Sequence, residues 1–520
     1  MALRRRPARY VRLLGLATAL ACADAVAFAS AMAQTLPMDP AAAPVPPPAG
    51  MDPDPYAPAL RGSGPTSMRQ AYKGAYAPVG QPVRPPKKTK PRTLRQTAPA
   101  PVPAPLFGPA AGTAPDLAGT LPTPGLPAIE QARRARRKAV QDDPYAPLGI
   151  DTGGLIWRPS IDVSGGYDTN PNRVGGRPRG STTFRQEGAL SVESDWERHA
   201  FTANLRGAYQ EYPSVRSANR PDGAGVADLR IDVLRDTQVD LGAAYLLTTE
   251  RPGSLEQPVV GSKRSTILTA GTSAMLTQRF GAVAVSLRGA VDRTSYGDLT
   301  QANGLEVSQG DRDFNAYGLR LRTGYQATPG LQPFVEATVD KRVYDSTLDV
   351  SGYDRTSSGV QGRVGSTFEI TRTVTGEASA GYGVRQYEDP RLADLRGPVA
   401  DVALIWSATP LTTVTLRGTA SLAETTVVGA TGAQVRTVAA EVSHALLRNL
   451  ILVGAASFTS TDYQGVPLRE TSYATGLKLE YRLTRSVALN ASFTHERLNG
   501  ATVGSDYTAN TFLVGMKLQP

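Results

Sequence analysis

The sequence predicts an all-β protein: a transmembrane antiparallel β-barrel of about 18 strands, with 16 as the alternative, preceded by a disordered proline-rich arm. Three observations support this prediction. Apolar and polar side chains alternate from about Leu155 to the last residue, the connections between segments alternate between short and long, and the tryptophans and tyrosines lie near different connections. A closed sheet with an apolar outer face and a polar inner face produces this pattern.

The alternation is clearest between Ser472 and Leu483. The odd positions there are Tyr, Thr, Leu, Leu, Tyr and Leu, whereas the even positions include Lys478, Glu480 and Arg482. A period of two places these two sets on opposite faces of a strand. One face therefore favours hydrocarbon and the other favours water, as in a barrel that crosses a membrane.

The whole segment from Leu155 onward divides into eighteen predicted strands. They begin near Leu155, Thr183, His199, Val226, Thr237, Arg264, Gly281, Asp313, Gln332, Arg355, Val374, Pro398, Leu411, Val435, Leu450, Glu470, Val487 and Asp506. Eight short turns alternate with nine longer connections; the short ones include Thr277–Phe280 and Leu483–Ser486, and the long ones include Asn170–Gly180, Arg251–Ser262 and Ser295–Gly310. This alternation predicts both termini in the periplasm and the long loops outside the cell.

Aromatic residues are sorted by the length of the neighbouring connection. Trp157, Trp196 and Trp406 lie near the N-terminal end of the first strand or near short turns. Most tyrosines lie toward the long loops, among them Tyr167, Tyr209, Tyr245, Tyr296, Tyr344, Tyr382, Tyr463, Tyr473 and Tyr507. Amphipathic rings prefer the two membrane–water interfaces, so this sorting predicts two aromatic belts. Trp157, Trp196, Trp406, Tyr167, Tyr245 and Tyr473 are the representative interface candidates.

The N-terminus has the pattern of a secretory signal peptide. Arginines follow Met1, an alanine-rich apolar stretch runs from Leu13 to Ala23, and Ala31-Met-Ala33 precedes Gln34. The apolar stretch is too short for a stable membrane span. We therefore expect a signal peptide at 1–33, with cleavage after Ala23 as a second possibility, and export to the outer membrane of a Gram-negative bacterium.

Residues 34–150 form the predicted arm, and residues 151–520 the barrel. The arm holds 26 of the 41 prolines and two basic clusters, at 87–92 and 133–138. Such a segment buries too little apolar surface to fold, so it is expected to be disordered in the periplasm. Of the net charge of +10, residues 1–34 contribute +4 and residues 35–150 contribute +7, which leaves the barrel at −1. The basic pI therefore does not indicate a nucleic-acid partner.

Alternation also assigns the side chains that face the lumen. The cationic set is Arg158, Arg185, Arg206, Arg230, Arg288, Arg320, Arg322, Arg342, Arg363, Arg385, Arg417, Lys478, Arg482 and Lys517. The acidic set is Asp162, Glu187, Glu193, Asp228, Asp232, Asp240, Asp292, Glu336, Asp340, Glu369, Glu377, Asp401, Glu441, Glu480 and Glu496. Because fourteen cations face fifteen anions, the sets predict wall ion pairs rather than an ion-selective pore.

Catalysis is not expected. Only three histidines are present; His199 falls beside a short turn, while His444 and His495 fall in the outward register of different strands. No nucleophile elbow, phosphate loop, calcium loop or zinc spacing appears, so we expect no enzyme activity, metal or cofactor. The single cysteine, Cys22, lies within the signal segment, so the exported chain has no thiol.

Several segments resemble a known family. Asp143-Pro-Tyr-Ala-Pro-Leu-Gly-Ile150, Gly154-Leu-Ile-Trp-Arg-Pro159 and Gly166-Tyr-Asp-Thr-Asn-Pro171 are similar to the start of the barrel in the putative β-barrel porin 2 family of Gram-negative outer-membrane proteins. The resemblance extends more loosely over 143–520. It implies an outer-membrane location and a barrel fold. One departure is the end of the chain, Lys517-Leu-Gln-Pro520, which lacks the aromatic residue on which such barrels often finish.

These features predict a porin-like channel for small hydrophilic solutes with little charge selectivity. Two alternatives stay open: an outer-membrane component of exopolysaccharide export, or a non-conducting structural barrel that tethers the envelope. The expected partners are outer-membrane lipid and the barrel-assembly machinery. The basic arm could also bind peptidoglycan or a periplasmic protein.

Overall fold

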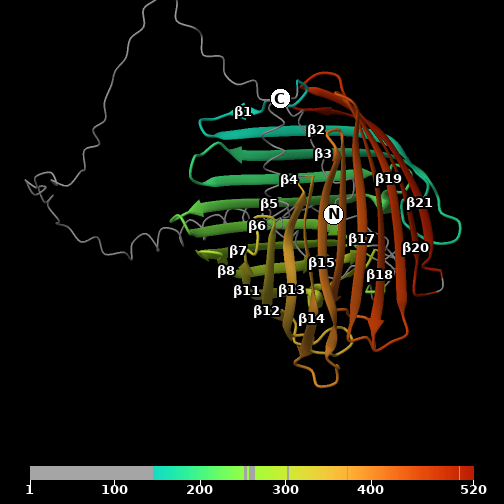
Figure 1. Ribbon diagram of the computed structural model, residues 1–520. Coiled ribbons are helices and arrows are strands. Elements are labelled where there is room, and N and C mark those ends of the chain that lie inside the picture. Colours follow the sequence, from blue (N-terminus) through green and yellow to red (C-terminus); the bar gives the residue numbers. More distant parts are fainter. Residues whose placement is uncertain (1–143, 251–254, 257–263, 301–303, 372, 503) are drawn as a thin grey trace, which may run out of the picture. The chain divides into compact units, whose positions relative to one another are not determined.

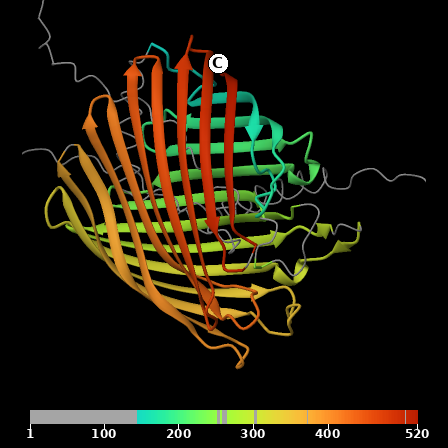
Figure 2. The same cartoon turned by 90° about the vertical axis from the view of Figure 1, so that its right-hand side faces the viewer.

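The computed structural model describes residues 144–250, 255–256, 264–300, 304–371, 373–502 and 504–520. The predicted signal peptide and nearly all of the predicted arm lie outside these residues. The described residues form a closed antiparallel barrel of eighteen long strands (Figure 1). Figure 2 shows the strands of the second half of the barrel, coloured orange to red, curving round its side.

The long strands are β2 (Leu155–Asp168), β3 (Ser181–Ser194), β4 (Ala200–Glu211), β5 (Arg220–Asp232), β6 (Thr237–Thr249), β7 (Thr266–Phe280), β8 (Val283–Tyr296), β11 (Phe314–Tyr325), β12 (Leu331–Tyr344), β13 (Ser357–Thr371), β14 (Val374–Tyr387), β15 (Leu395–Thr409), β16 (Thr412–Ala423), β17 (Gly432–Leu447), β18 (Leu450–Gln464), β19 (Arg469–Arg482), β20 (Val487–Asn499) and β21 (Tyr507–Leu518). Short elements accompany them: β1 (Ile150–Asp151), β9 (Leu299–Thr300), β10 (Glu306–Val307) and the 3-10 turns η1 (Arg216–Ala218) and η2 (Gly310–Arg312).

The barrel closes where the first and last long strands meet. β2 pairs with β21 from Ile161–Leu518 to Asp168–Thr511, and every other long strand pairs with its neighbours in sequence. Closure satisfies the backbone hydrogen bonds of both terminal strands, which a membrane interior requires. β21 thus completes the ladder by pairing with β2.

The predicted strand number of eighteen is confirmed, and several boundaries differ. The sequence placed a turn at Thr277–Phe280, but β7 continues to Phe280 and the turn consists of Gly281 and Ala282. Gly281 has φ of +60°, a conformation that tight hairpin turns require and that glycine adopts without a steric penalty. β5 begins at Arg220, six residues before the predicted Val226, because its ladder with β4 extends toward the long connection.

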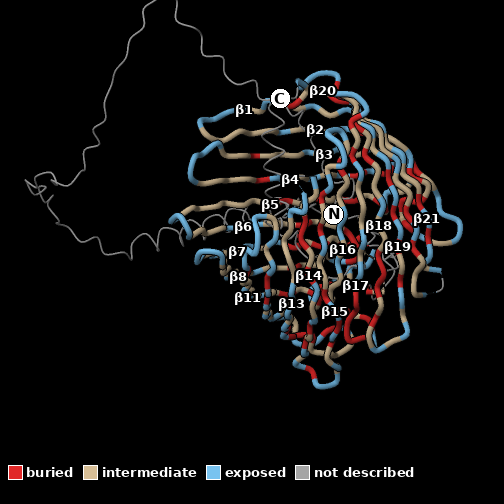
Figure 3. The backbone as a smooth tube through the Cα atoms, viewed as in Figure 1, coloured by how far each residue is buried: buried red, intermediate tan, exposed pale blue. Residues whose placement is uncertain are grey.

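Burial alternates along the strands, as Figure 3 shows by colour. On β13, Val360 and Val364 are 61% and 64% exposed, whereas Arg363 between them is only partly exposed. The exposed side chains of this register are mostly apolar, as on a surface that contacts lipid. A charge placed there at the bilayer midplane would cost about 2–4 kcal/mol. In the described part of the chain, no helix is both long enough and apolar enough to cross a membrane.

Candidate functional site at the loop-bearing end of the barrel

Charged side chains on one face of the sheet form ion pairs that pass over intervening strands. Arg322 on β11 pairs with Glu377 on β14 at 2.8 Å, and Arg385 on β14 pairs with Asp340 on β12. Two strands separate the first pair and one separates the second. Such side chains meet most directly over the concave side of a curved sheet, so this face is the inside of the barrel.

The strand registers place the predicted lumen-facing residues on this inner face. Some of them form ion pairs: Arg206 with Glu187 at 3.5 Å, Arg230 with Asp232 at 3.2 Å, Arg320 with Glu336 at 3.7 Å, Arg342 with Glu424 at 3.4 Å and Arg482 with Glu480 at 2.8 Å. Others have no ion pair within 4.0 Å among the described residues: Arg288, Asp292, Arg363, Arg417 and Lys478. Local ion pairs therefore neutralise only part of the charge on the inner wall.

The long connections lie at one end of the barrel, and several of them contact one another over its inner face. We call this end the mouth; its inward connections are the described parts of 169–180, 212–219, 250–265, 297–313, 345–356 and 424–431. Arg264 donates a hydrogen bond to the Pro171 carbonyl at 2.8 Å. Arg355 donates one to the Thr425 carbonyl at 2.7 Å. Both bonds join connections that are distant in sequence, so they narrow the mouth.

A first buried charge cluster centres on Glu424, which follows β16. Its carboxylate lies 3.4 Å from Arg342 and 3.1 Å from Arg385. It also accepts hydrogen bonds from Tyr344 Oη at 2.9 Å and from the Ser357 hydroxyl. Burial alone would raise the pKa of Glu424, but the two guanidiniums outweigh it and the pKa is lowered. The carboxylate thus stays ionised and ties three regions of the wall together.

A second cluster centres on Arg173 in the β2–β3 connection. Its guanidinium pairs with Asp168 at 2.7 Å and with Glu496 on β20 at 2.8 Å. Arg173 has a positive φ of 56°, which is uncommon for a residue with a side chain. Although burial opposes it, these carboxylates raise the pKa of Arg173. The cluster fixes the β2–β3 connection against the barrel wall.

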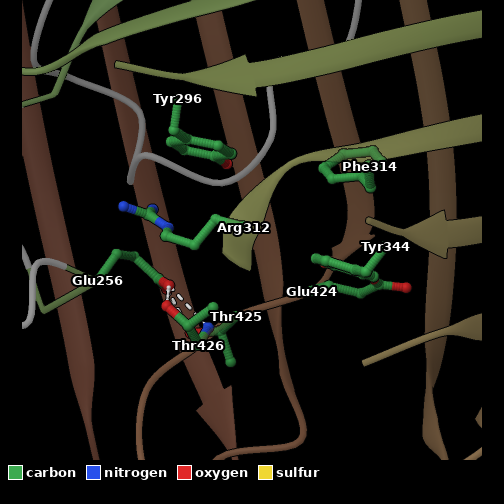
Figure 4. A pocket seen from close by; sticks show the side chains of 8 residues that line it. All are labelled: Glu256, Tyr296, Arg312, Phe314, Tyr344, Glu424, Thr425 and Thr426. Carbon is green, nitrogen blue, oxygen red and sulfur yellow. Dashed lines mark hydrogen bonds between the residues drawn. The ribbon is translucent and has the colours of Figure 1, made fainter. Parts of the chain in front are cut away.

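A third set of polar contacts joins the β6–β7 connection to the β16–β17 connection. Glu256 accepts hydrogen bonds from the Thr426 backbone N–H and hydroxyl, both at 2.7 Å, and from the Thr425 hydroxyl. Figure 4 shows these bonds beside Arg312. Six long strands lie between the two connections along one side of the barrel and eight along the other, not counting the strands that they join. We call this contact the cross-mouth contact.

Aromatic and charged residues enclose a small cavity beside the cross-mouth contact. Its volume is about 20 Å³, and its lining includes Tyr296, Phe314 and Tyr344 (Figure 4). Arg312 lies over the Tyr296 ring at 4.0 Å and pairs with Glu250 at 2.9 Å. This volume holds about one water molecule. In this conformation the cavity is too small for a solute and belongs to the closed packing of the mouth.

Apolar side chains reinforce the same contact. Leu255, next to Glu256, packs against a buried cluster of Val427, Ala430, Ala433 and Tyr463. Burial of apolar surface contributes about 25 cal/mol per Å². The cross-mouth contact therefore combines charge-assisted hydrogen bonds with hydrophobic packing.

The predicted interface aromatics all lie in the outward register or at the rim of the barrel. Trp196 lies in the β3–β4 turn and is 44% exposed, while Trp406, Tyr167 and Tyr473 are 45%, 50% and 44% exposed. Trp157 donates to the Thr152 hydroxyl at 2.9 Å, and Tyr245 donates to the Arg206 carbonyl at 2.8 Å. The contact of these six residues with the two membrane interfaces stays a prediction.

Four tyrosines that the sequence assigned to the long-loop belt face inward instead. Tyr296 and Tyr344 line the cavity of the mouth, and Tyr463 and Tyr507 are 6% and 4% exposed. Each occupies the register shared with inward charged residues, as when Tyr344 follows Arg342 at a spacing of two. Proximity to a long loop places these rings toward the loop-bearing ends of their strands, but it does not give their face.

The histidines lie apart from one another. His444 contacts Thr412 Oγ1 at 2.9 Å, His495 contacts Asn510 Oδ1 at 2.7 Å, and His199 Nδ1 accepts from the Asp232 N–H at 3.2 Å. No group of three or more potential metal ligands occurs in the described ranges. Each of these contacts joins a histidine to a residue of a neighbouring strand.

Sequence reasoning missed the residues that narrow the mouth. Arg173, Glu256, Arg264, Arg312 and Glu424 all lie in connections, where a period of two gives no information about direction. Part of the predicted long connection Ser295–Gly310 lies outside the described residues. Its described portion includes the β9–β10 hairpin, in which Leu299 is fully buried. The one available signal was the density of Arg, Glu and Tyr in segments otherwise rich in turn residues.

Comparison with solved structures finds barrels of low sequence identity. The copper transporter OprC is 11% identical over 71% of this chain and 81% of its own, with a TM-score of 0.39. Acinetobacter baumannii OccAB4 is 12% identical over 71% of this chain and 99% of its own, with a TM-score of 0.37. Pseudomonas aeruginosa OpdQ is 10% identical over 70% and 98%, with a TM-score of 0.36. No curated protein matches the chain.

The family comparison covers the whole barrel. Residues 143–520 match the family described as putative beta-barrel porin 2. The match starts at the first residues that the sequence resemblance used and ends at the last residue of the chain. The chain therefore belongs to the putative beta-barrel porin 2 family, and its barrel has the porin-like fold of outer-membrane β-barrel proteins.

Proposed function

We propose that the barrel is a channel of the outer membrane for small hydrophilic solutes, with little preference between anions and cations. The observation that carries the proposal is the inner wall, where cationic and acidic side chains alternate in similar numbers and partly pair. Arg322–Glu377 and Arg482–Glu480, both at 2.8 Å, are examples. A barrel of about eighteen strands is wide enough for a water-filled channel.

The wall favours neutral solutes for a physical reason. A selective pore concentrates one sign of charge at its constriction, whereas neighbouring opposite charges cancel one another's field within a few ångströms in water. The polar wall still offers hydrogen bonds to hydroxyl-rich molecules. We expect access to be controlled at the mouth, where connections distant in sequence contact one another.

Reversal potentials test the selectivity. With the pure protein in a planar bilayer under a KCl gradient, the expected reversal potential is close to zero, since potassium and chloride should pass at comparable rates. A reversal potential near the Nernst value of either ion would mean that one sign dominates the conducting path. The matched variant is Glu377→Gln, which leaves Arg322 without its 2.8 Å partner and should shift the potential toward anion preference.

We further propose that the mouth faces the outside of the cell and the short turns face the periplasm. Thr347 in the β12–β13 connection and Thr484 in the β19–β20 turn are both exposed, and the only native cysteine, Cys22, lies in the predicted signal peptide. In intact cells, a membrane-impermeant maleimide should label Thr347→Cys and spare Thr484→Cys. Labelling of Thr484→Cys alone would reverse the orientation.

A further inference from the structure

The cluster around Arg173 contains more positive than negative charge. Arg173, Arg220 and Arg264 interact electrostatically with one another and with Tyr212. The two nearby carboxylates, Asp168 and Glu496, both pair with Arg173. Arg220 and Arg264 have no carboxylate within 4.0 Å in the described part of the chain. Two guanidiniums therefore share this part of the mouth without an anionic partner.

Hydrogen bonding leaves the same two side chains incomplete. Arg264 donates from Nη2 to the Pro171 carbonyl at 2.8 Å, and Arg220 donates from Nη2 to Gln210 Oε1 at 3.2 Å. The Nε and Nη1 atoms of both residues are buried and have no hydrogen-bond partner among the described residues. Arg220 is only 5% exposed and Arg264 only 4%. Buried donors on charged groups normally have acceptors.

The electrostatics agree with the geometry. Burial, together with the charges of Arg220 and Arg173, lowers the pKa of Arg264 to about 9. Tyr212 does not supply the missing negative charge, because burial raises the pKa of its phenol. Its hydroxyl instead donates to Asp168 at 3.1 Å. A ligand that carries negative charge would relieve the mutual repulsion of the arginines.

We propose that Arg220 and Arg264 form a binding site for an oxyanion group, a phosphate or a carboxylate, at the mouth of the barrel. Adjacent Nε and Nη donors of a guanidinium match two oxygens of such a group. Chloride has no such pair of oxygens, so the two arginines hold it less strongly than an oxyanion. The site is therefore compatible with a weak preference between potassium and chloride in the KCl experiment. This proposal depends on the proposed channel function in one respect only, namely that the anion reaches the site through the channel.

Calorimetric titration tests binding without requiring conduction. The full-length protein, folded in detergent micelles in chloride buffer, is titrated with inorganic phosphate and separately with acetate. Arg220→Gln and Arg264→Gln should each weaken phosphate binding by about ten- to a hundredfold, because each removes charge-assisted hydrogen bonds. Arg264→Lys keeps the charge but loses the paired donors, and should bind phosphate more weakly than the wild-type protein.

Arg391→Gln is the matched control, since Arg391 lies in another long connection, is exposed and already pairs with the Asp389 carboxylate at 2.6 Å. The phosphate affinity of this variant should equal that of the wild-type protein. Heat-modifiable migration on gels verifies folding of every variant. Binding of phosphate alone, or of both ligands, supports the site and tells the two oxyanions apart. The proposal is overturned if neither ligand binds, or if the folded Arg220→Gln and Arg264→Lys variants bind phosphate as tightly as the wild-type protein does. A channel that conducts but binds neither oxyanion would overturn this inference while leaving the proposed function intact.

Discussion

Glu424→Gln is expected to lower the free energy of unfolding by about 3–5 kcal/mol, the usual cost of removing one partner from a buried ion pair. Glu424 is 6% exposed, and its carboxylate compensates both Arg342 at 3.4 Å and Arg385 at 3.1 Å. Glutamine keeps the shape but leaves Arg342 without a carboxylate within 4.0 Å among the described residues, and leaves Arg385 with Asp340 alone. The midpoint of urea unfolding in lipid vesicles, followed by loss of heat-modifiable migration, measures the effect.

The control for this prediction is Glu388→Gln. Glu388 pairs with Lys341 at 3.0 Å, but both side chains are about half exposed, at 51% and 52%. An exposed pair contributes only about 0–1 kcal/mol, because water screens it. If both variants lost the same stability, the Glu424 cluster would not be a buried, compensating arrangement.

The same cluster predicts a pH dependence. Arg342 and Arg385 lower the pKa of Glu424 below its ordinary value of 4.5, against the raising effect of burial. A carboxyl group with a lowered pKa in the folded state stabilises the fold fully above its unfolded pKa. This stabilisation should therefore be lost as the pH falls from about 4.5 through the lowered pKa, and Glu424→Gln should flatten the acid limb of the stability profile.

Glu256→Ala is expected to increase the time that the channel spends in its high-conductance state by at least about tenfold. The substitution removes three hydrogen bonds to a carboxylate from the cross-mouth contact. Each such bond contributes about 1.5–3 kcal/mol, and 1.4 kcal/mol changes an equilibrium constant tenfold. Single-channel recording of the pure protein measures the occupancy of each conductance level.

Thr347→Ala is the control for the cross-mouth prediction, since Thr347 is exposed in the β12–β13 connection. It should record the same current levels as the wild-type protein. Identical gating of the Glu256→Ala and wild-type proteins would show that the cross-mouth contact does not limit conduction.

Most of the barrel could be predicted from its sequence because strand periodicity is a local property. Side chains two positions apart share a face, so the inward placement of Arg322 or Lys478 follows once the strand is recognised. The positions of the turns were predicted less accurately from the sequence. The predicted turn before Gly281 was wrong because hydrophobicity does not distinguish the end of a strand from a turn. The positive φ of Gly281 does mark the turn.

The mouth could not be predicted in this way because its contacts are non-local. Arg173 and Glu496 are separated by 323 positions, and Glu256 and Thr425 by 169. No periodicity relates such residues, and a connection can bend inward or outward with the same composition. Tyr344 illustrates the limit: its position near a long loop was evident, but its inward direction depends on the strand register and on Glu424.

Solute flux into proteoliposomes tests the central claim most directly. Vesicles that contain the pure, folded protein are mixed with an isotonic solution of a small neutral sugar, and swelling is followed by light scattering. The account predicts swelling that is faster than in protein-free vesicles, slower for larger sugars, and accelerated by Glu256→Ala. Folded wild-type and Glu256→Ala proteins that both leave the vesicles as impermeable as lipid alone would contradict it, and would identify the barrel as a non-conducting structure.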